Sequence, residues 1–205
     1  MKSLFLADAL AFAARLWSGA SVRAQSADSL GSEQRVYVAN HSSHLDFIVL
    51  WAALPPDLCR VTRPVAARDY WQKTALRRFL AIEIYRAILI EREHISQSNN
   101  PIEQIAAEMG QDSLILFPEG TRGNGEGIGV FKSGIYHLLT KKPGLQCVPV
   151  YIENLNRVLP KGEILPVPLL CSIAMGAPLR RGADEPKRAF LERLRGAVVA
   201  LKDGN

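Results

Sequence analysis

Two polar segments of this 205-residue chain hold residue types that can do chemistry. The first is the run Asn40-His41-Ser42-Ser43-His44-Leu45-Asp46, in which a histidine precedes an aspartate by five positions. On one continuous helix this spacing would separate the two side chains by about 140°. If His41 instead lies in the turn before the helix, its ring can fold back towards Asp46 in the first helical turn. Ser42 or Ser43 would then cap the helix.

Such a pair provides a base and the group that orients it. The carboxylate fixes the tautomer of the imidazole, and the other ring nitrogen is free to take a proton from a hydroxyl. This is part of a catalytic triad without an obvious protein nucleophile, so the hydroxyl of a substrate could serve as the nucleophile. A lone histidine and aspartate at this spacing are also typical of capping and surface residues, so the pair alone assigns no function.

The second segment is Phe117-Pro118-Glu119-Gly120-Thr121-Arg122, which follows an apolar run predicted to be a strand. Ligands of open α/β sheets bind where such strands end. Glycine lets a backbone approach a ligand closely, and the arginine fork can hold a phosphate. Residues 131–134 would then open a helix whose N-terminal amides favour an anion. Alone, the segment is also typical of a surface loop, because more glycines follow at Gly123, Gly125, Gly127 and Gly129.

The elements around these segments alternate between strands and helices. The pattern predicts strands at 35–39, 58–65, 85–90, 113–117, 147–152 and 169–175, and helices at 43–53, 69–81, 101–110, 131–141 and 184–201. Asn100 and Pro101 are typical of a helix start, and Asp69 is a second candidate cap. Residues 154–168 hold three prolines and predict a surface loop. The alternation indicates the α/β class, with one domain whose mostly parallel sheet is flanked by helices.

The N-terminal segment is apolar from residue 4 to residue 17, apart from Asp8 and Arg15. A spanning helix needs about 20 apolar residues, so this run is too short. On a helix the two charges share one narrow stripe beside a wide apolar face, which is typical of a helix lying in a membrane surface. We therefore expect a membrane-associating helix at 1–24 and a domain at 30–205. The alternatives are a helix packed on the domain and a signal peptide cleaved near residues 22–24, against which the internal charges argue.

The formal net charge of +5 is concentrated between Arg60 and Arg78. This window holds six basic residues and one acidic residue, with Tyr70, Trp71 and Phe79 among or next to them. A basic and aromatic patch fits a phospholipid leaflet, a phosphate-bearing ligand or an acidic carrier protein. The plain alternative is a solvated face. Nucleic acid would fit the charge, but no nucleic-acid module is recognisable around the patch, so we expect no such partner.

The three cysteines, Cys59, Cys147 and Cys171, are odd in number and widely spaced. Neither a disulfide framework nor a zinc site fits this spacing, and a reducing cytosol is the default. We expect the three side chains to be small buried hydrophobic groups.

Together, the two polar segments resemble the lysophospholipid acyltransferase family, whose best-known members are the 1-acylglycerol-3-phosphate acyltransferases. The family pattern is N-H-x4-D followed by F-P-E-G-T-R, and Glu119 lies 78 positions after His41, a separation like the family's. Residues 88–92, which end in Arg92, are similar to the family's second block, and residues 148–150 to its fourth. The resemblance spans about residues 35 to 175. The second block usually begins with glycine where this chain has Arg86, which bears on the acceptor more than on the chemistry.

The resemblance implies a glycerolipid acyltransferase fold and O-acyl transfer. His41, held by Asp46, would deprotonate the hydroxyl of a lysophospholipid. The oxygen would attack the thioester of acyl-CoA or acyl carrier protein, with no acyl-enzyme. The expected acceptor is 1-acylglycerol-3-phosphate, giving phosphatidic acid. The substrate-binding residues by this resemblance are Arg92, Glu119, Gly120, Thr121 and Arg122, with Lys132 as a further candidate.

The resemblance implies no metal or bound cofactor, and it places the protein at the cytoplasmic face of the membrane as a peripheral or monotopic protein. Two alternatives remain. Arg86 motivates a different acceptor, such as a lyso-aminolipid, a glycolipid or another lysophospholipid. The N-terminal helix and the basic patch motivate a non-catalytic lipid-binding adaptor, against which the presence of His41, Asp46, Glu119 and Arg122 argues.

Overall fold

The computed structural model describes the chain except for residues 1, 20, 44, 92–99, 124–126, 154–170, 203 and 205. In residues 2–5 and 16–18 it describes the backbone but not the side chains. Arg92 and the predicted loop at 154–168 therefore lie outside the described residues.

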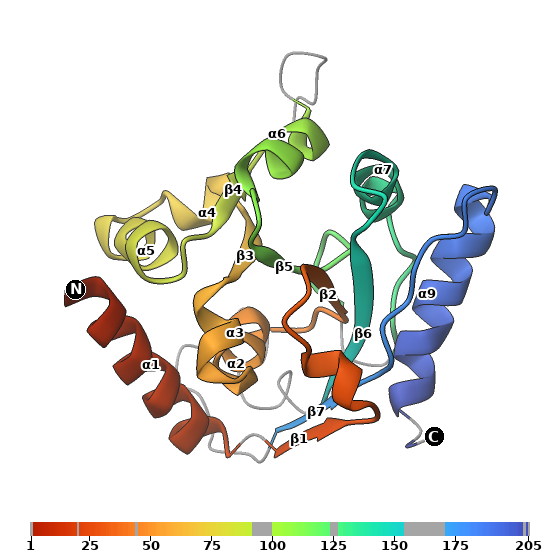
Figure 1. Cartoon of the computed structure of the whole chain (residues 1–205). Helices are drawn as coiled ribbons and strands as arrows, with labels where there is room; N and C mark the ends of the chain where they lie inside the picture. Colours follow the sequence, from red (N-terminus) through yellow and green to blue (C-terminus); the bar gives the residue numbers. More distant parts are fainter. Residues whose placement is uncertain are drawn as a thin grey trace.

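A seven-stranded sheet in the order β1-β7-β6-β2-β5-β3-β4 forms the centre of the molecule (Figure 1). Its neighbouring strands run parallel except for β6 and β7, which are antiparallel. This confirms the predicted α/β class and the mostly parallel sheet. The strands are β1 (Ser21–Ala24), β2 (Arg35–Ala39), β3 (Thr62–Ala67), β4 (Ile88–Ile90), β5 (Ser113–Leu116), β6 (Gln146–Glu153) and β7 (Ser172–Met175).

Helices cover both faces of the sheet. The described helical elements are α1 (Lys2–Ser18), η1 (Ala27–Leu30), α2 (Asp46–Ala53), α3 (Pro56–Arg60), α4 (Arg68–Trp71), α5 (Ala75–Phe79), the π-helix η2 (Leu80–Ile84), α6 (Pro101–Glu108), α7 (Gly134–Lys141) and α9 (Lys187–Lys202). One hydrophobic core lies beneath α1 and α2, and the other lies beneath α6, α7 and α9. Figure 1 shows these two groups of helices on opposite sides of the sheet.

Strand β2 contributes to both cores and is buried along its whole length. Tyr37 and Ala39 belong to the core beneath α1 and α2, whereas Val36 and Val38 belong to the core beneath α6, α7 and α9. Successive side chains of a strand point to opposite faces, so this apolar run suits a strand covered on both sides. The residue that follows β2 is therefore held by a rigid central element.

Two predicted elements are wrong because local capping overrides the hydrophobic pattern. The strand predicted at 58–65 begins only at Thr62, since Pro56 opens α3 at a first helical position that needs no N–H donor. The helix predicted at 69–81 is divided into α4, α5 and η2. The hydroxyl of Thr74 accepts a hydrogen bond from the Arg77 N–H and starts a new helix, while Asp69 lies inside α4.

The predicted start of α6 is confirmed, because the Asn100 side chain accepts a hydrogen bond from the Ile102 N–H and Pro101 follows at the first helical position. Gly110 has a φ of +52°, in the left-handed region. The helical segment ends there, as the glycine at this position predicted. Residues 21–24, which were predicted to belong with the N-terminal helix, instead form β1 and pair with β7.

Helix α1 packs against α2, and its polar stripe faces the protein. Ala7 and Ala11 are buried in the core, Asp8 forms an ion pair with Arg60 at 3.1 Å, and Arg15 donates hydrogen bonds to carbonyls at the end of α2. Phe12 lies one helical turn after Asp8, beside the polar stripe, and is 62% exposed. Among the helices that the structure describes, none combines the length and the apolar character needed to cross a bilayer.

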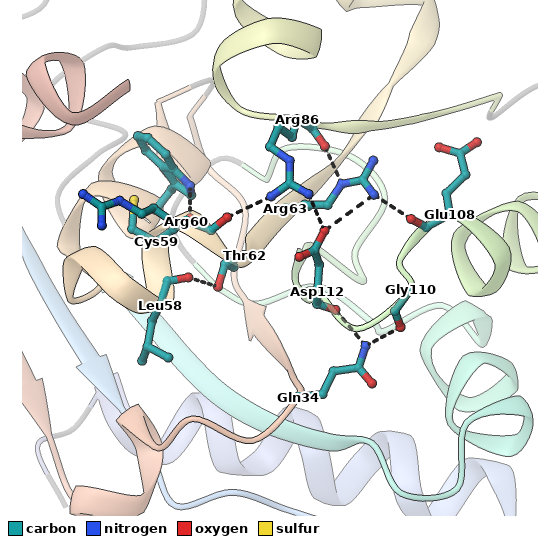
Figure 2. A network of polar contacts seen from close by, with 11 residues as sticks. Gln34, Leu58, Cys59, Arg60, Thr62, Arg63, Arg86, Glu108, Gly110 and Asp112 are labelled. Carbon is teal, nitrogen blue, oxygen red and sulfur yellow. Dashed lines mark hydrogen bonds and ion pairs between the residues drawn. The ribbon is translucent and has the colours of Figure 1, made fainter. Parts of the chain in front are cut away.

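A polar network joins the N-terminal ends of the parallel strands (Figure 2). Arg63 donates hydrogen bonds to the carbonyls of Arg86 at 2.6 Å and Glu108 at 2.6 Å. Arg86 in turn donates to Asp112 Oδ2 at 2.7 Å and to the Arg60 carbonyl at 2.8 Å. Burial, followed by the neighbouring Arg86 charge, lowers the pKa of Arg63. The network fastens the starts of β3, β4 and β5 to one another.

Arg86 has a φ of +51°, in the left-handed region that favours glycine. Glycine, which the resemblance led us to expect here, adopts this conformation without strain. Arg86 precedes β4, whereas His41 follows β2, so the two lie at opposite edges of the parallel strands. Arg86 therefore gives no reason to expect an unusual acceptor.

The backbone strain at Arg86 can be measured with a pair of variants. Arg86→Ala and Arg86→Gly both lose the guanidinium bonds, but only alanine keeps a side chain in the left-handed region. That conformation costs a residue with a Cβ atom roughly 1–2 kcal/mol. We expect the alanine variant to be less stable than the glycine variant by about 1 kcal/mol in urea unfolding. Equal stability of the two variants would contradict strain at this position.

Candidate active site

The two polar segments meet at the carboxyl edge of the sheet. β2 and β5 are parallel neighbours, so the residues that follow them lie side by side. The ring of His41 stacks on the ring of Phe117, with centroids 4.4 Å apart and planes 24° apart. Segments almost 80 residues apart in sequence thus form one site.

His41 and Asp46 form the expected pair. The imidazole Nδ1 lies 2.7 Å from Asp46 Oδ2, and the Asp46 side chain is fully buried. The same oxygen accepts hydrogen bonds from the N–H groups of Ser42 at 2.7 Å and Ser43 at 2.9 Å. Because Asp46 Oδ2 acts only as an acceptor here, Nδ1 of His41 carries the proton and donates it to this bond. Nε2 is therefore the nitrogen that can accept a proton.

The prediction that His41 precedes its helix is confirmed, because α2 begins at Asp46. The predicted helix start at Ser43 and the serine cap are wrong. Leu45 occupies the N-cap position and makes no side-chain cap bond, whereas the Ser43 hydroxyl accepts from the Leu45 N–H at 3.3 Å. The reason is that the Asp46 carboxylate reaches back to the N–H groups of residues 42 and 43 and holds them in a turn.

Glu119 lies beneath this turn with both carboxylate oxygens engaged by the backbone. Oε1 accepts a hydrogen bond from the His41 N–H at 2.7 Å, and Oε2 accepts one from the Gly129 N–H at 2.7 Å. The residue is 9% exposed. The Gly123 N–H donates to the His41 carbonyl at 2.8 Å, so the loop after β5 holds both polar groups of the His41 backbone.

A cavity of about 230 Å³ adjoins His41. Phe117, Arg122 and Lys73 line it, together with the aromatic residues of α4. A second cavity of about 650 Å³ lies between β5, α6 and α7 and is lined mostly by apolar side chains. Phe117, Gly120 and Thr121 line both cavities. The site thus has a cavity of mixed lining beside the base and a larger, mostly apolar cavity that shares lining residues with it.

The turn at Gly120 separates two cations that the sequence predicted for substrate binding. Arg122 lines the smaller cavity and Lys132 lines the larger one. Gly120 has a φ of +72°, and a Cβ atom there would lie 2.7 Å from Lys132 Nζ. The backbone conformation therefore favours glycine, and a larger residue would also displace the end of the Lys132 side chain. Thr121 is exposed at the same turn.

Two residues of the site were missed by the sequence analysis. Phe117 was included in the motif without a role, although its position directly after a buried strand beside β2 could have indicated contact with His41. Lys73 was counted only with the basic patch. No sequence signal indicates its approach to the cavity, because this approach depends on the break between α4 and α5.

The prediction of one compact basic patch at 60–78 is wrong, because its members lie in different parts of the fold. Arg63 belongs to the network at the opposite edge of the sheet, and Arg68 forms an ion pair with Glu91 at 3.4 Å. Arg77 and the exposed Lys73 and Arg78 lie on or beside α5. Only this last group remains as a candidate anionic-surface contact within the described part of the window.

Comparisons with known proteins agree in pointing to acyltransferases. A family model described as Acyltransferase matches residues 21–153. The 1-acyl-sn-glycerol-3-phosphate acyltransferase of Haemophilus influenzae is 26% identical over 136 residues, which cover 60% of this chain and 51% of that protein. The enzyme of the same name from Escherichia coli is 25% identical over 146 residues, which cover 64% of this chain and 54% of that protein. The chain spans about half the length of the curated relatives it matches.

A solved structure shares the fold. The crystal structure of PlsC from Thermotoga maritima, described as a 1-acyl-sn-glycerophosphate (LPA) acyltransferase, matches with a TM-score of 0.73 at 18% identity. The match covers 97% of this chain and 79% of that chain. At this identity the likeness shows the fold alone, and it includes the helix and the strand that precede β2.

The three cysteines offer no nucleophile at this site. None of the three forms a disulfide, and all three side chains are buried, as predicted. Burial raises the pKa of Cys59 and of Cys147 to about 12. Burial and then the nearby Asp46 charge raise the pKa of Cys171 to about 11. These thiols remain protonated near neutral pH, and the thiolate is the reactive form.

We therefore expect the folded protein to resist iodoacetamide at pH 8. A thiol with a raised pKa is about 0.1% ionised or less at this pH, and the thiolate becomes populated only as the pH approaches that raised value. Unfolding returns each thiol to an ordinary pKa near 8.5, so denatured protein should be alkylated at all three sites. Mass spectrometry of both samples measures the difference. Rapid alkylation of Cys171 in folded protein would contradict its protected state.

Proposed function

The chain belongs to the Acyltransferase family, and we propose that it transfers a fatty acyl group from a thioester to the hydroxyl of a lysophospholipid. The observation that carries the proposal is the 2.7 Å hydrogen bond between His41 and Asp46 beside a cavity that Arg122 also lines. An oriented base next to a cation suits an acceptor that carries both a hydroxyl and a phosphate.

In the proposed reaction, Nε2 of His41 takes the proton of the acceptor hydroxyl. The oxygen forms a bond with the thioester carbonyl carbon and generates a tetrahedral oxyanion. When this intermediate collapses, the carbon–sulfur bond breaks and the thiolate takes the proton from His41. The products are an ester and a free thiol, and Asp46 keeps the imidazole in the reactive tautomer throughout.

The acceptor that we propose is 1-acylglycerol-3-phosphate, with phosphatidic acid as the product. The names of the bacterial relatives support it, as do Arg122 and Lys132 on either side of the Gly120 turn. Arg92, which lies outside the described residues, is a further candidate for the same phosphate. Acyl-CoA and acyl carrier protein both remain as donors, because each presents the same thioester.

The chemistry is tested with His41→Ala and Asp46→Asn. We expect His41→Ala to abolish acylation of lysophosphatidic acid by acyl-CoA. Asp46→Asn should lower kcat by about 10³-fold, because the amide no longer fixes the tautomer of the base. Transfer of a radiolabelled acyl group from acyl-CoA to lysophosphatidic acid by the purified proteins measures both effects, and full activity of His41→Ala would contradict the mechanism.

A panel of lysolipids tests the acceptor in the same assay. Preferred acylation of a lyso-aminolipid, a glycolipid or another lysophospholipid would replace the proposed acceptor. Liposome binding without turnover on any acceptor or donor would instead favour a lipid-binding adaptor.

We also propose that the protein binds the cytoplasmic face of a membrane through α1, α5 and η2. Large apolar side chains are exposed on these elements, at Leu6, Phe12, Leu76, Phe79 and Ile82. α1 and η2 are in contact, and Figure 1 shows α5 above the N-terminal end of α1. Lys73, Arg77 and Arg78 supply positive charge beside these residues, which suits anionic lipid. Because Lys73 also lines the cavity beside His41, this surface leads to the proposed site.

The membrane proposal is tested by vesicle sedimentation. A double variant, Leu76→Ser and Phe79→Ser, should bind vesicles of phosphatidylglycerol and phosphatidylcholine about tenfold more weakly, because two inserted apolar side chains are lost. Phe12→Ser should show a smaller loss. Val22→Ser is the matched control, since Val22 is also exposed but lies on β1 at the other end of the sheet. Equal binding by the double variant and the control would contradict α5 as a contact.

A further inference from the structure

We propose that Glu119 is a positioning residue that fastens the backbone of His41 to the loop before α7, and that it does not bind the acceptor. Its two carboxylate oxygens accept hydrogen bonds from the N–H groups of His41 and Gly129, each at 2.7 Å. The effect on turnover rests on the proposed function, whereas the fastening itself does not.

The contacts around His41 divide between ring and backbone. Asp46 and Phe117 hold the ring through a hydrogen bond and a stacked contact. Glu119 and Gly123 hold the backbone through the N–H and the carbonyl. Since His41 follows β2 and lies outside any helix, these side contacts replace the restraint that regular secondary structure would provide. A small shift of the base relative to the hydroxyl is costly, because proton transfer needs hydrogen-bond geometry.

The chemistry of the contacts requires a carboxylate. Both partners are backbone N–H groups, which can only donate, so each Glu119 oxygen must act as an acceptor. A glutamine would present one amide N–H group to another donor and would leave a buried N–H without its partner. A carboxylate at this place also disfavours direct contact with an acceptor phosphate, because the two groups carry the same charge.

Gly129 shows how closely the loop approaches Glu119. A Cβ atom at Gly129 would lie 2.8 Å from Glu119 Oε2, so any larger residue must push the carboxylate or the loop aside. A Cβ atom at Gly127 would meet no atom of the described residues within 4 Å. These two glycines therefore provide a matched pair, in which the same added methyl group disturbs the carboxylate in one variant and no described residue in the other.

The kinetic test separates positioning from acceptor binding. We expect Glu119→Gln to lower kcat by at least tenfold and to leave the KM for lysophosphatidic acid within about twofold. Gly129→Ala should also lower kcat without changing the KM. Gly127→Ala should have the kcat and KM of the wild-type protein. Arg122→Gln, which removes a cation from the cavity, should instead raise the KM. A Glu119→Gln variant with normal kcat and a raised acceptor KM would overturn the inference.

A second readout needs no turnover. In Glu119→Gln, the amide hydrogens of His41 and Gly129 should exchange with solvent at least tenfold faster by NMR, while amides of β2 remain unchanged. Unchanged exchange at both amides would overturn the fastening. If wild-type protein acylates no lysolipid but the variant shows faster exchange, the proposed function fails and the fastening stands. Gly129→Ala provides the same measurement if Glu119→Gln does not fold.

Discussion

One carboxylate oxygen, Oδ2 of Asp46, accepts hydrogen bonds from the His41 ring and from the N–H groups of Ser42 and Ser43. Because the Asp46 side chain is fully buried at the start of α2, the three bonds replace hydrogen bonds that Oδ2 would make with water. They also keep residues 41–43 out of the helix and turn the imidazole back over its first turn. The loop after β5 is built around this arrangement, since it contacts His41 through Phe117, Glu119 and Gly123.

The two edges of the parallel strands serve different purposes. At the carboxyl edge, His41 and Arg122 lie on loops that follow β2 and β5, and each lines a cavity that shares residues with a second one. At the amino edge, Arg63, Arg86 and Asp112 bind one another and nearby carbonyls. Rigidity at the amino edge holds the strands in register, and this register sets the separation of the loops at the carboxyl edge. An arginine in the left-handed region is acceptable there because its guanidinium makes bonds that a glycine cannot make.

Helix α1 packs on the protein and still exposes part of its apolar surface. Its polar stripe is directed towards the protein, where Asp8 meets Arg60 and Arg15 binds carbonyls at the end of α2. Phe12, beside this stripe, remains exposed, and α1 also contacts η2. The packed helix and the surface-binding helix, which were alternatives from sequence, are therefore compatible. The charges within the apolar run are accounted for by contacts inside the fold.

The sequence by itself determined the class of the fold, the central strand, the capped start of α6 and the His41–Asp46 pair, because each depends on short-range pattern or spacing. It also indicated that the Phe117–Arg122 segment belongs with that pair, through the resemblance of the two motifs. The contacts between those motifs were decided by the tertiary structure, since the parallel pairing of β2 and β5 brings them together. The same holds for the backbone contacts of Glu119, the division of the basic window and the location of Arg86. These depend on which strands are neighbours and on where a capping threonine or proline breaks a helix, and neither is encoded in spacing alone.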